Sequence, residues 1–349
     1  MKKLSVFKRI ICLVLCLVSA LPLSACGETK MAQAQVYAMD TVMTVTAYGK
    51  EREKGIAAAQ SVIVSMDNML NPKLPTSSTY AINHAQGQSV VISGQMATML
   101  STAKTVYDQS GGALDLTLYP LIKRWGFEDN KFYEPTAEEI AMDLSRLCFK
   151  DMILTSFPSS GSYSVAFPSY AEISFASIGK GCASSNAVDA MRQAGVTSGI
   201  ISMGGNVQTL GNRPDGTKWE IAVQDPNFPQ NYLGVLSIGE TAVVTSGAYQ
   251  KNFTNLKGKT YHHLINPATG YPTNHNLVSA TIICQDGTMA DALSTAMFVL
   301  GETKALNYWR TYGGFEMILV RSDNHIICTK GLIEEFTLVN ENYTMSFTE

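Results

Sequence analysis

Two oxygen-bearing side chains lie one helical turn apart in the stretch TMADALSTAMFVLG, residues 288–301, which otherwise has the pattern of an apolar helix. Residues four positions apart share a helix face, so the Asp291 carboxylate and the Thr295 hydroxyl can point at one position. Hard oxygen ligands suit Mg²⁺, which keeps water ligands and is commonly bound together with substrate phosphates. The pair therefore predicts a magnesium site beside a phosphate-bearing ligand.

The same stretch also has a purely structural interpretation. Thr288 is well placed as the helix N-cap, and Asp291 three residues later makes a pattern that resembles a capping box. A threonine hydroxyl inside a helix, such as that of Thr295, can bond to its own backbone. On this stretch alone both interpretations stay open.

A phosphate needs donors elsewhere, and the stretch ASIGKGCASSNAV offers Lys180 between two glycines. We expect it at a strand end that opens a helix, where free backbone amides favour anions. It is not a Walker motif, and such a turn can also be structural. In YHHLINPATGYP, His262 and His263 are adjacent, so in an extended segment at most one faces a given site.

Two glycine-paired turns are further candidates. In GGALDLTLYP, Asp115 and Thr117 follow a double glycine, where a capped turn is the simpler explanation. In SMGGN, residues 202–206, the backbone can approach a ligand closely because glycine has no side chain. Neither turn identifies a ligand by itself.

The elements that position these residues follow from periodicity and turn signals. Helical spacing covers 51–70, 93–112 with Ser93 as cap, and 136–147, while short strand patterns dominate from about residue 150 onward. Helices are also expected after Lys180 and around Asp291, and YAEISFASIG is expected to be a strand. Strands joined mostly by turns predict an α+β fold with largely antiparallel sheets flanked by helices, in one compact unit.

The first 26 residues have the pattern of a bacterial lipoprotein signal. A basic start precedes a short apolar run and the sequence Leu-Ser-Ala-Cys. We expect a signal peptide over 1–25, lipidation at Cys26, a tether over 26–35 and the catalytic domain over 36–349. The alternative, an uncleaved anchor, fits less well because the run is short for a spanning helix. Both place the protein outside the cytoplasm, attached to a bacterial membrane.

Charge and cysteine content narrow the function classes. Removing residues 1–25 takes away four basic and no acidic residues, so the net charge changes from −3 to −7. An acidic chain without a basic cluster argues against nucleic acid as a partner. Beyond the anchor, Cys148, Cys182, Cys284 and Cys328 form no CxxC pair, so we expect buried free thiols rather than zinc ligands.

Taken together, seven segments in consistent order resemble the ApbE family, the periplasmic or extracellular FAD:protein FMN transferases. The resemblance runs from about Met39 to Leu300, nearly the whole mature chain, behind a lipoprotein signal. The segments are MDT (39–41), GGALDLTLYPL, SIGKG, SMGGNV, VVTSGAY, HHLINPATGYP and DALSTA.

The resemblance implies roles for individual residues. Asp291 and Thr295 take the positions of the family's Mg²⁺ ligands, and Ser177 the position that completes the site through its backbone carbonyl. His263 takes the position of the family's histidine near the reacting phosphate. The positions that contact FAD are Met39, Ala113, Leu114, Asp115, Ser174, Lys180 and Ile265.

Four positions depart from the family pattern. Ser174 and Ala248 replace aspartates, Asn266 stands in INPATG where the family has IDPRTG, and Asp40 replaces the glycine of M-G-T. Three of the four remove charged groups. They bear on how FAD is bound and oriented more than on the metal site.

The implied reaction transfers FMN from FAD to a Thr or Ser hydroxyl of an acceptor flavoprotein and releases AMP, with Mg²⁺ on the pyrophosphate. The acceptor would belong to an extracytoplasmic electron-transfer system, which a membrane tether suits. Three alternatives are an FAD pyrophosphatase that uses water, a non-catalytic FAD-binding lipoprotein, and a solute-binding lipoprotein. Together, His263, Asp291 and Thr295 favour the catalytic alternatives.

Overall fold

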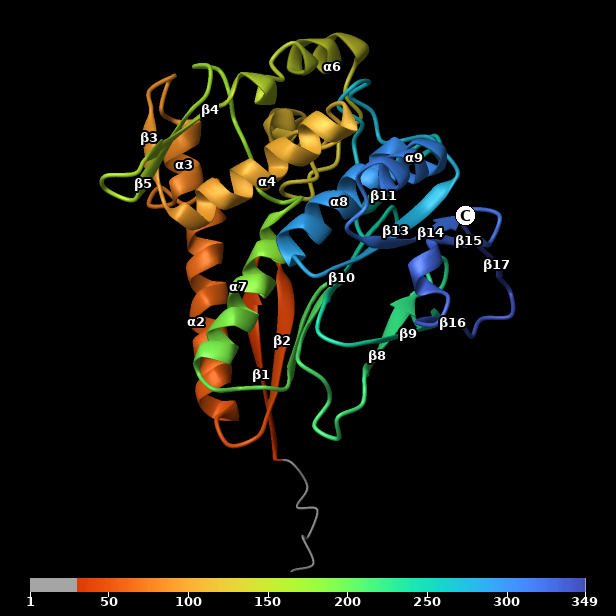
Figure 1. Ribbon diagram of the computed structural model, residues 1–349. Coiled ribbons are helices and arrows are strands. Elements are labelled where there is room, and N and C mark those ends of the chain that lie inside the picture. The colour runs from red at the N-terminus through yellow and green to blue at the C-terminus, as the bar shows by residue number, and fades with distance from the viewer. Residues whose placement is uncertain (1–29, 349) are drawn as a thin grey trace, which may run out of the picture. The chain divides into compact units, whose positions relative to one another are not determined.

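A nine-stranded sheet runs through the computed structural model, which describes residues 30–348 (Figure 1). Neighbouring strands are antiparallel except for the last pair, β15 and β17, which is parallel. The strands in sheet order are β1 (Met31–Ala38), β2 (Thr41–Tyr48), β6 (Gly199–Met203), β7 (Asn206–Leu210), β10 (Ala242–Gly247), β13 (Leu277–Cys284), β14 (Glu316–Arg321), β15 (His325–Cys328) and β17 (Thr344–Phe347).

Three smaller β elements accompany this sheet. Two are three-stranded antiparallel sheets and one is a two-stranded hairpin. The first three-stranded sheet has the order β3 (Val90–Ile92), β5 (Ser162–Ala166), β4 (Ile153–Phe157). The second has the order β16 (Phe336–Leu338), β9 (Tyr232–Ile238), β8 (Trp219–Gln224). The hairpin is formed by β11 (Asn252–Thr254) and β12 (Thr260–His262).

Helices cover one face of the large sheet, with α2 against β1 and β2, α7 against β6 and β7, and α8 against β10 and β13 (Figure 1). The helices are α2 (Arg52–Leu70), α3 (Ser78–Asn83), α4 (Gly94–Ser110), α5 (Tyr119–Arg124), α6 (Ala137–Leu144), α7 (Gly179–Gln193), α8 (Gly287–Leu300) and α9 (Glu302–Tyr312), with short 3-10 turns η1 (Leu116–Leu118), η2 (Phe149–Asp151) and η3 (Lys330–Leu332).

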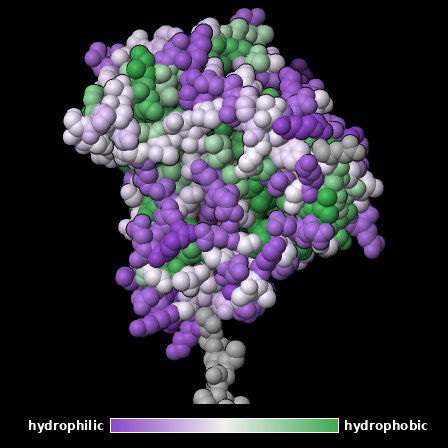
Figure 2. All heavy atoms as spheres, in the orientation of Figure 1, coloured by the Kyte–Doolittle hydropathy of each residue, from purple (hydrophilic) through white to green (hydrophobic). Residues whose placement is uncertain are grey.

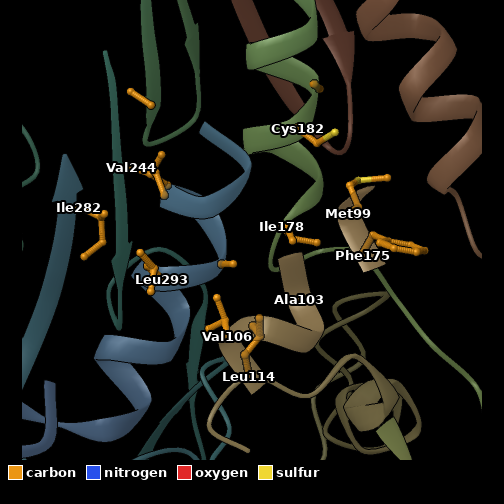
Figure 3. Close-up of a cluster of buried hydrophobic side chains, with 14 of the residues drawn as sticks. Met99, Ala103, Val106, Leu114, Phe175, Ile178, Cys182, Val244, Ile282 and Leu293 are labelled. Atoms are coloured by element: carbon orange, nitrogen blue, oxygen red, sulfur yellow. The ribbon is translucent and has the colours of Figure 1, made fainter. Parts of the chain in front are cut away.

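The two faces of the large sheet belong to different cores because successive strand residues point to opposite sides. On β13, Ile282 packs with the helices, whereas Ile283 packs with the sheet of β8, β9 and β16. Figure 3 shows the helix-side core, where Met99 of α4 lies beside Phe175, and Val106 of the same helix lies on the side toward Leu293 of α8. The predicted α+β fold with largely antiparallel sheets is therefore confirmed.

Hydrophilic side chains cover much of the molecular face drawn in Figure 2, and hydrophobic areas on it are smaller. Among residues 30–348, no helix combines the length and the apolar character needed to cross a membrane. The predicted signal peptide and Cys26 lie outside the described residues.

The N-terminal boundary predicted from the sequence is wrong in part. Residues 31–35, expected in a tether, belong to β1, whose every residue pairs with β2 from Met31 opposite Tyr48 to Ala38 opposite Thr41. The stretch 36–49 has the alternation of a single strand in sequence, but it is divided by a turn in which Met39 and Asp40 have φ of 49° and 59°. β1 is an edge strand with one face in solvent, so polar residues alternate along it. In sequence this polar content resembles that of a tether.

The expected strand at 170–179 is also wrong. Ile173 and Phe175 alternate as buried residues, but the backbone there pairs with no strand. Instead, Ile173 N–H donates to the Asn83 side chain at 2.8 Å, and the Asn83 amide donates back to the Ile173 carbonyl at 3.0 Å. A side chain therefore satisfies the backbone groups that a neighbouring strand would otherwise pair.

Candidate active site

A cavity of about 250 Å³ lies beside the first turns of α7 and α8 and the end of β10. It gathers segments that are far apart in the sequence, and ten of the eleven site residues predicted within residues 30–348 line it. These ten are Ala113, Leu114, Asp115, Ser174, Ser177, Lys180, His263, Ile265, Asp291 and Thr295.

Asp291 is held by the neighbouring helix. Its side chain is almost completely buried, and Oδ2 accepts a hydrogen bond of 2.8 Å from the backbone N–H of Gly181 in the first turn of α7. The predicted capping role is wrong, because Asp286 is the N-cap of α8 and accepts from the N–H groups of Thr288 and Met289. The Asp291 carboxylate is therefore not used to cap its own helix.

The contact between α7 and α8 requires glycine at position 181. A Cβ atom there would lie 2.0 Å from the Gly287 carbonyl oxygen and 2.6 Å from Cβ of Asp291. Both distances are far shorter than real contacts, so a side chain at 181 would push the two helices apart. The bare backbone allows the Gly181 amide to reach the carboxylate.

Thr295 lies one turn after Asp291 on α8, as predicted, and lines the same cavity. Its Oγ1 is 3.4 Å from Oγ of Ser246 on β10, and Ser246 Oγ is in turn 2.8 Å from Oγ of Ser294. The Ser294 hydroxyl donates to the Asp291 carbonyl. These hydroxyls connect β10 to the helix and orient Thr295 from the side.

Lys180 supplies a positive charge beside the carboxylate. Its Nζ is 3.9 Å from Oδ1 of Asp291, which is beyond hydrogen-bond distance, and its side chain stays about a quarter exposed. Ser177 lies in the turn that precedes α7 and also lines the cavity. The second oxygen of Asp291 thus faces the cavity side with a cation nearby.

These oxygens fit Mg²⁺. Among residues 30–348, no group of three or more His, Cys, Asp or Glu side chains could hold a metal ion, so a zinc-type site is not formed there. Asp291 keeps one oxygen for coordination while Gly181 fixes the other. A carboxylate, a hydroxyl and a carbonyl from Asp291, Thr295 and Ser177 are the hard donors that Mg²⁺ takes.

His263 lines the cavity directly after β12. Its Nδ1 is 3.1 Å from the Lys251 carbonyl oxygen, which can only accept, so Nδ1 carries the proton and Nε2 has a free lone pair in the neutral ring. Burial, with smaller contributions from the charges of His262, Lys180 and Lys251, lowers the pKa of His263 to about 4. The ring is therefore neutral at physiological pH and can accept a proton at Nε2.

The adjacent His262 faces elsewhere, as expected for neighbours in a strand. Its Nε2 bonds to the Thr273 carbonyl at 3.1 Å, and its ring packs edge-on against Phe298. Burial lowers the pKa of His262 as well. Of the pair, His263 lines the cavity.

Asp115 is both a cap and a cavity residue. It is the N-cap of the short helix η1, and its Oδ1 accepts from the N–H and the hydroxyl of Thr117. Burial raises the pKa of Asp115, and the two hydrogen bonds from Thr117 partly oppose that rise. The structural interpretation of this turn is correct, and the same loop brings Ala113 and Leu114 to the cavity wall.

Met39 is the one predicted residue of the described part that does not line the cavity. Its backbone N–H donates to Asp67 at 2.9 Å, and its neighbour Asp40 lines the cavity instead. Asp40 occupies the left-handed backbone region, which glycine adopts most easily and aspartate tolerates. The turn thus places a carboxylate where the family pattern has no side chain.

The other departures have local explanations. Ser174 lines the cavity, whereas Ala248 packs against the helix-side core. Asn266 caps its own turn, because its Oδ1 accepts from the N–H of Ala268 at 2.9 Å. An aspartate at 266 could accept the same bond, so the turn does not require the asparagine.

Sequence reasoning missed several cavity residues that carry no motif of their own. They lie inside or next to a recognised segment, and their apolar or polar type alone gives no signal. They are Tyr119, Phe127, Glu128, Thr245, Ser246, Gln250 and Lys251. The Gly204–Gly205 turn was recognised only as a place for close approach, and it does line the cavity.

Comparison with known proteins gives the same family over most of the chain. The ApbE family matches residues 39–319. A Haemophilus influenzae protein named FAD:protein FMN transferase is 28% identical over 337 residues, 92% of this chain and 95% of its own length. The Escherichia coli K12 protein of that name is 30% identical over 259 residues, 73% of each chain. The prediction of a transferase is thereby confirmed.

Solved structures share the fold. The ApbE protein of Thermotoga maritima superposes with a TM-score of 0.79 at 24% identity and covers 87% of this chain and 98% of its own. The apo form of the Pseudomonas stutzeri flavinyl transferase ApbE gives a TM-score of 0.77 at 24% identity, with 89% and 98% covered. Because the family match includes Asp291, Thr295, His263 and the cavity loops between them, the chain belongs to the ApbE family.

Proposed function

We propose that this protein transfers FMN from FAD to a threonine or serine hydroxyl of an acceptor protein, with Mg²⁺ bound and AMP released. The observation that carries the proposal is the buried Asp291 carboxylate, which has one oxygen fixed by Gly181 and shares a cavity with the neutral His263. Curated relatives that carry the name FAD:protein FMN transferase support the same substrate.

The α7 and α8 wall binds the pyrophosphate of FAD. Asp291, Thr295 and the Ser177 carbonyl would hold the metal, and Lys180 adds a positive charge at the same end. Bound Mg²⁺ would neutralise charge on the phosphate oxygens. Ala113, Leu114 and Ile265 supply apolar surface for the remainder of the substrate.

His263 accepts the proton of the acceptor hydroxyl. The acceptor oxygen bonds to the FMN-side phosphorus while the bond from that phosphorus to the bridging oxygen breaks, and AMP leaves with the bridging oxygen. Nε2 of His263 takes the hydroxyl proton, since Nδ1 is committed to the Lys251 carbonyl. Burial keeps the imidazole neutral and therefore available as a base.

The proposal includes a location. A lipid on Cys26 would hold the enzyme at the outer side of a bacterial membrane, where acceptors of an electron-transfer system are reached. The sequence pattern of residues 1–26 supports this part of the proposal.

The test incubates purified protein with FAD and an acceptor flavoprotein domain, with Mg²⁺ or with EDTA. We expect covalent flavin fluorescence on the acceptor and one AMP per flavin, with both lost in EDTA and restored by Mg²⁺. Free FMN and AMP without labelled acceptor would instead identify a pyrophosphatase. Tightly held FAD that stays unchanged after hours would identify a binding protein.

A further inference from the structure

The backbone of Lys251 fixes the place of His263 in the cavity. Its carbonyl oxygen accepts two hydrogen bonds from His263, one from the backbone N–H and one from Nδ1, each 3.1 Å long. Asn252 of β11 pairs with His262 of β12, so Lys251 stands opposite His263 at the next position of the same register. Directly opposed residues of an antiparallel pair have their Cβ atoms about 5 Å apart on the same face. The Lys251 side chain and the His263 ring therefore leave the hairpin on the same side.

That side of the hairpin faces the cavity, because Lys251 and His263 both line it. Lys251 is half-buried. Burial is the largest cause of the lowered pKa of His263, and the charge of Lys251 is one of three neighbouring charges that add to it. The other two belong to His262 and Lys180. The Lys251 ammonium is therefore close enough to the ring to act on it electrostatically.

The charge of Lys251 is not balanced inside the described part of the chain. Lys180, the other lysine that lines the cavity, has its Nζ 3.9 Å from Oδ1 of Asp291. Lys251 forms no salt bridge with any of residues 30–348. Charges that are withdrawn from water are normally paired, so a half-buried cation facing a cavity favours an anion as the ligand beside it.

We propose that the Lys251 ammonium binds the FMN-side phosphate of FAD and neutralises its oxygens while the acceptor hydroxyl attacks. The inference rests on the proposed function, in which His263 takes the proton of that hydroxyl. The hydroxyl attacks the FMN-side phosphorus in line with the leaving AMP, so a base beside the hydroxyl also lies beside this phosphate. Lys251 is the cation next to that base, whereas Lys180 lies next to Asp291. The two lysines would thus serve different phosphates of one substrate.

Side-chain substitutions at position 251 isolate the ammonium, because the carbonyl that holds His263 belongs to the backbone and remains. Lys251→Met and Lys251→Gln remove the charge, and Lys251→Arg keeps it. Lys54→Met is the matched control, since it removes one lysine charge at an exposed position of α2. Urea unfolding and riboflavin affinity should be alike in all these proteins.

Single-turnover transfer at saturating FAD and Mg²⁺ measures the chemical step. We expect both uncharged variants to transfer flavin about thirtyfold more slowly than the wild type, and Lys251→Arg to stay within about threefold of it. Lys54→Met should match the wild type.

The pH dependence of the same rate gives a readout that a purely structural role would not move. Loss of a neighbouring cation raises the pKa of His263, and only the neutral ring accepts a proton. The fall of the rate on the acid side should therefore move to higher pH in Lys251→Met and Lys251→Gln. In Lys251→Arg it should stay where it is in the wild type.

Ligand binding tests the phosphate contact without any transfer. Quenching of flavin fluorescence compares FMN, which carries the phosphate, with riboflavin, which lacks it, in EDTA so that no metal contributes. We expect the wild type and Lys251→Arg to bind FMN about tenfold tighter than riboflavin. The uncharged variants should lose most of this preference, because they lose only the contact with the phosphate.

An FMN preference that survives in both uncharged variants, or a transfer rate in them close to that of the wild type, overturns the assignment of Lys251. The proposed function fails in a different way. An FMN preference that depends on the charge at 251, in proteins that never label an acceptor, contradicts the transferase and leaves the phosphate contact standing. Normal labelling that ignores the charge at 251 does the reverse.

Discussion

The cavity has two walls that are built in opposite ways. On the α7 and α8 wall, Asp291 is almost completely buried and is fixed by a backbone amide from a helix packed so closely that only glycine fits at 181. On the opposite wall, His263 and Lys251 lie at the base of a hairpin whose tip is fully exposed.

The difference follows from what each wall has to recognise. A metal and a pyrophosphate are the same in every turnover, so their ligands gain from rigid placement. Under the proposed function an acceptor protein arrives from solution, so the wall that receives it would gain from side chains that are open to solvent. Substitutions on the first wall should therefore affect every reaction of FAD, and those on the second wall mainly its transfer to protein.

Asp291→Asn should have the largest effect. It keeps an oxygen for the Gly181 amide but loses the charge that the metal needs, so we expect transfer to fall by about a thousandfold or more. Asp286→Ala is the matched control, since it removes the N-cap of the same helix. We expect it to cost about 1 kcal/mol of stability and to leave the transfer rate close to wild type. Initial rates and urea unfolding measure both variants. More than a tenth of wild-type activity in Asp291→Asn would contradict the metal site.

His263→Gln should rank next. Loss of the proton acceptor is expected to slow transfer by about a hundredfold, with the Mg²⁺ concentration for half-maximal rate unchanged because that residue belongs to the other wall. Single-turnover rates across a Mg²⁺ titration check this. A shift in the metal requirement would mean that the two walls are not independent.

Gly181→Ala should act on the metal wall without replacing any ligand. The added Cβ would clash with the Gly287 carbonyl and with Asp291, so we expect about a tenfold higher Mg²⁺ requirement and a loss of about 2 kcal/mol of stability. Gly179→Ala is the control, because its Cβ would meet the flexible end of Leu70 at 3.0 Å and otherwise only Cβ of Phe175, at the ordinary contact distance of 3.8 Å. Equal behaviour of the two variants would show that the close helix contact has no role in metal binding.

The smallest expected effect is on acid stability. The folded pKa of His263 is about 4 and the unfolded value about 6.5, so the unfolded chain binds more protons between these values and stability is lost as pH falls from 6.5 to 4. Because the ring is partly open to cavity water, we expect this loss in the free energy of unfolding to be about 2 kcal/mol. Urea unfolding at pH 7 and pH 4.5 should show a smaller acid loss in His263→Gln. Burial also lowers the pKa values of His262 and His275. These two residues therefore add to the acid loss of stability equally in the wild type and in His263→Gln.

The residues that meet at the cavity could largely be predicted from the sequence, because a carboxylate and a hydroxyl at i and i+4 and a Gly-flanked lysine are local patterns. The helix around Asp291 and the cap at Ser93 were also predicted correctly. The partner of Asp291 could not be predicted, since the Gly181 amide lies 110 positions away and only the packing of α7 on α8 joins them.

The errors share one physical cause. Thr288 and Asp286 are both good cap residues, and only the backbone bend at Asp286 decides between them. The segment around Ile173 has the alternation of a strand, but Asn83 takes the place of the neighbouring strand. In β1 the polar alternation of an edge strand resembles a linker. Each error concerns which partner satisfies the backbone, which a local pattern does not contain.

The four cysteines of residues 30–348 have a consequence for how the enzyme tolerates oxidants. All four are buried free thiols, and burial raises the pKa of Cys182 and Cys148 to about 11 and that of Cys328 to about 12. Only thiolates react quickly with peroxides, disulfides or alkylating reagents. These sulfurs therefore behave as apolar packing atoms, and we expect them to react only slowly with such reagents while the protein is folded.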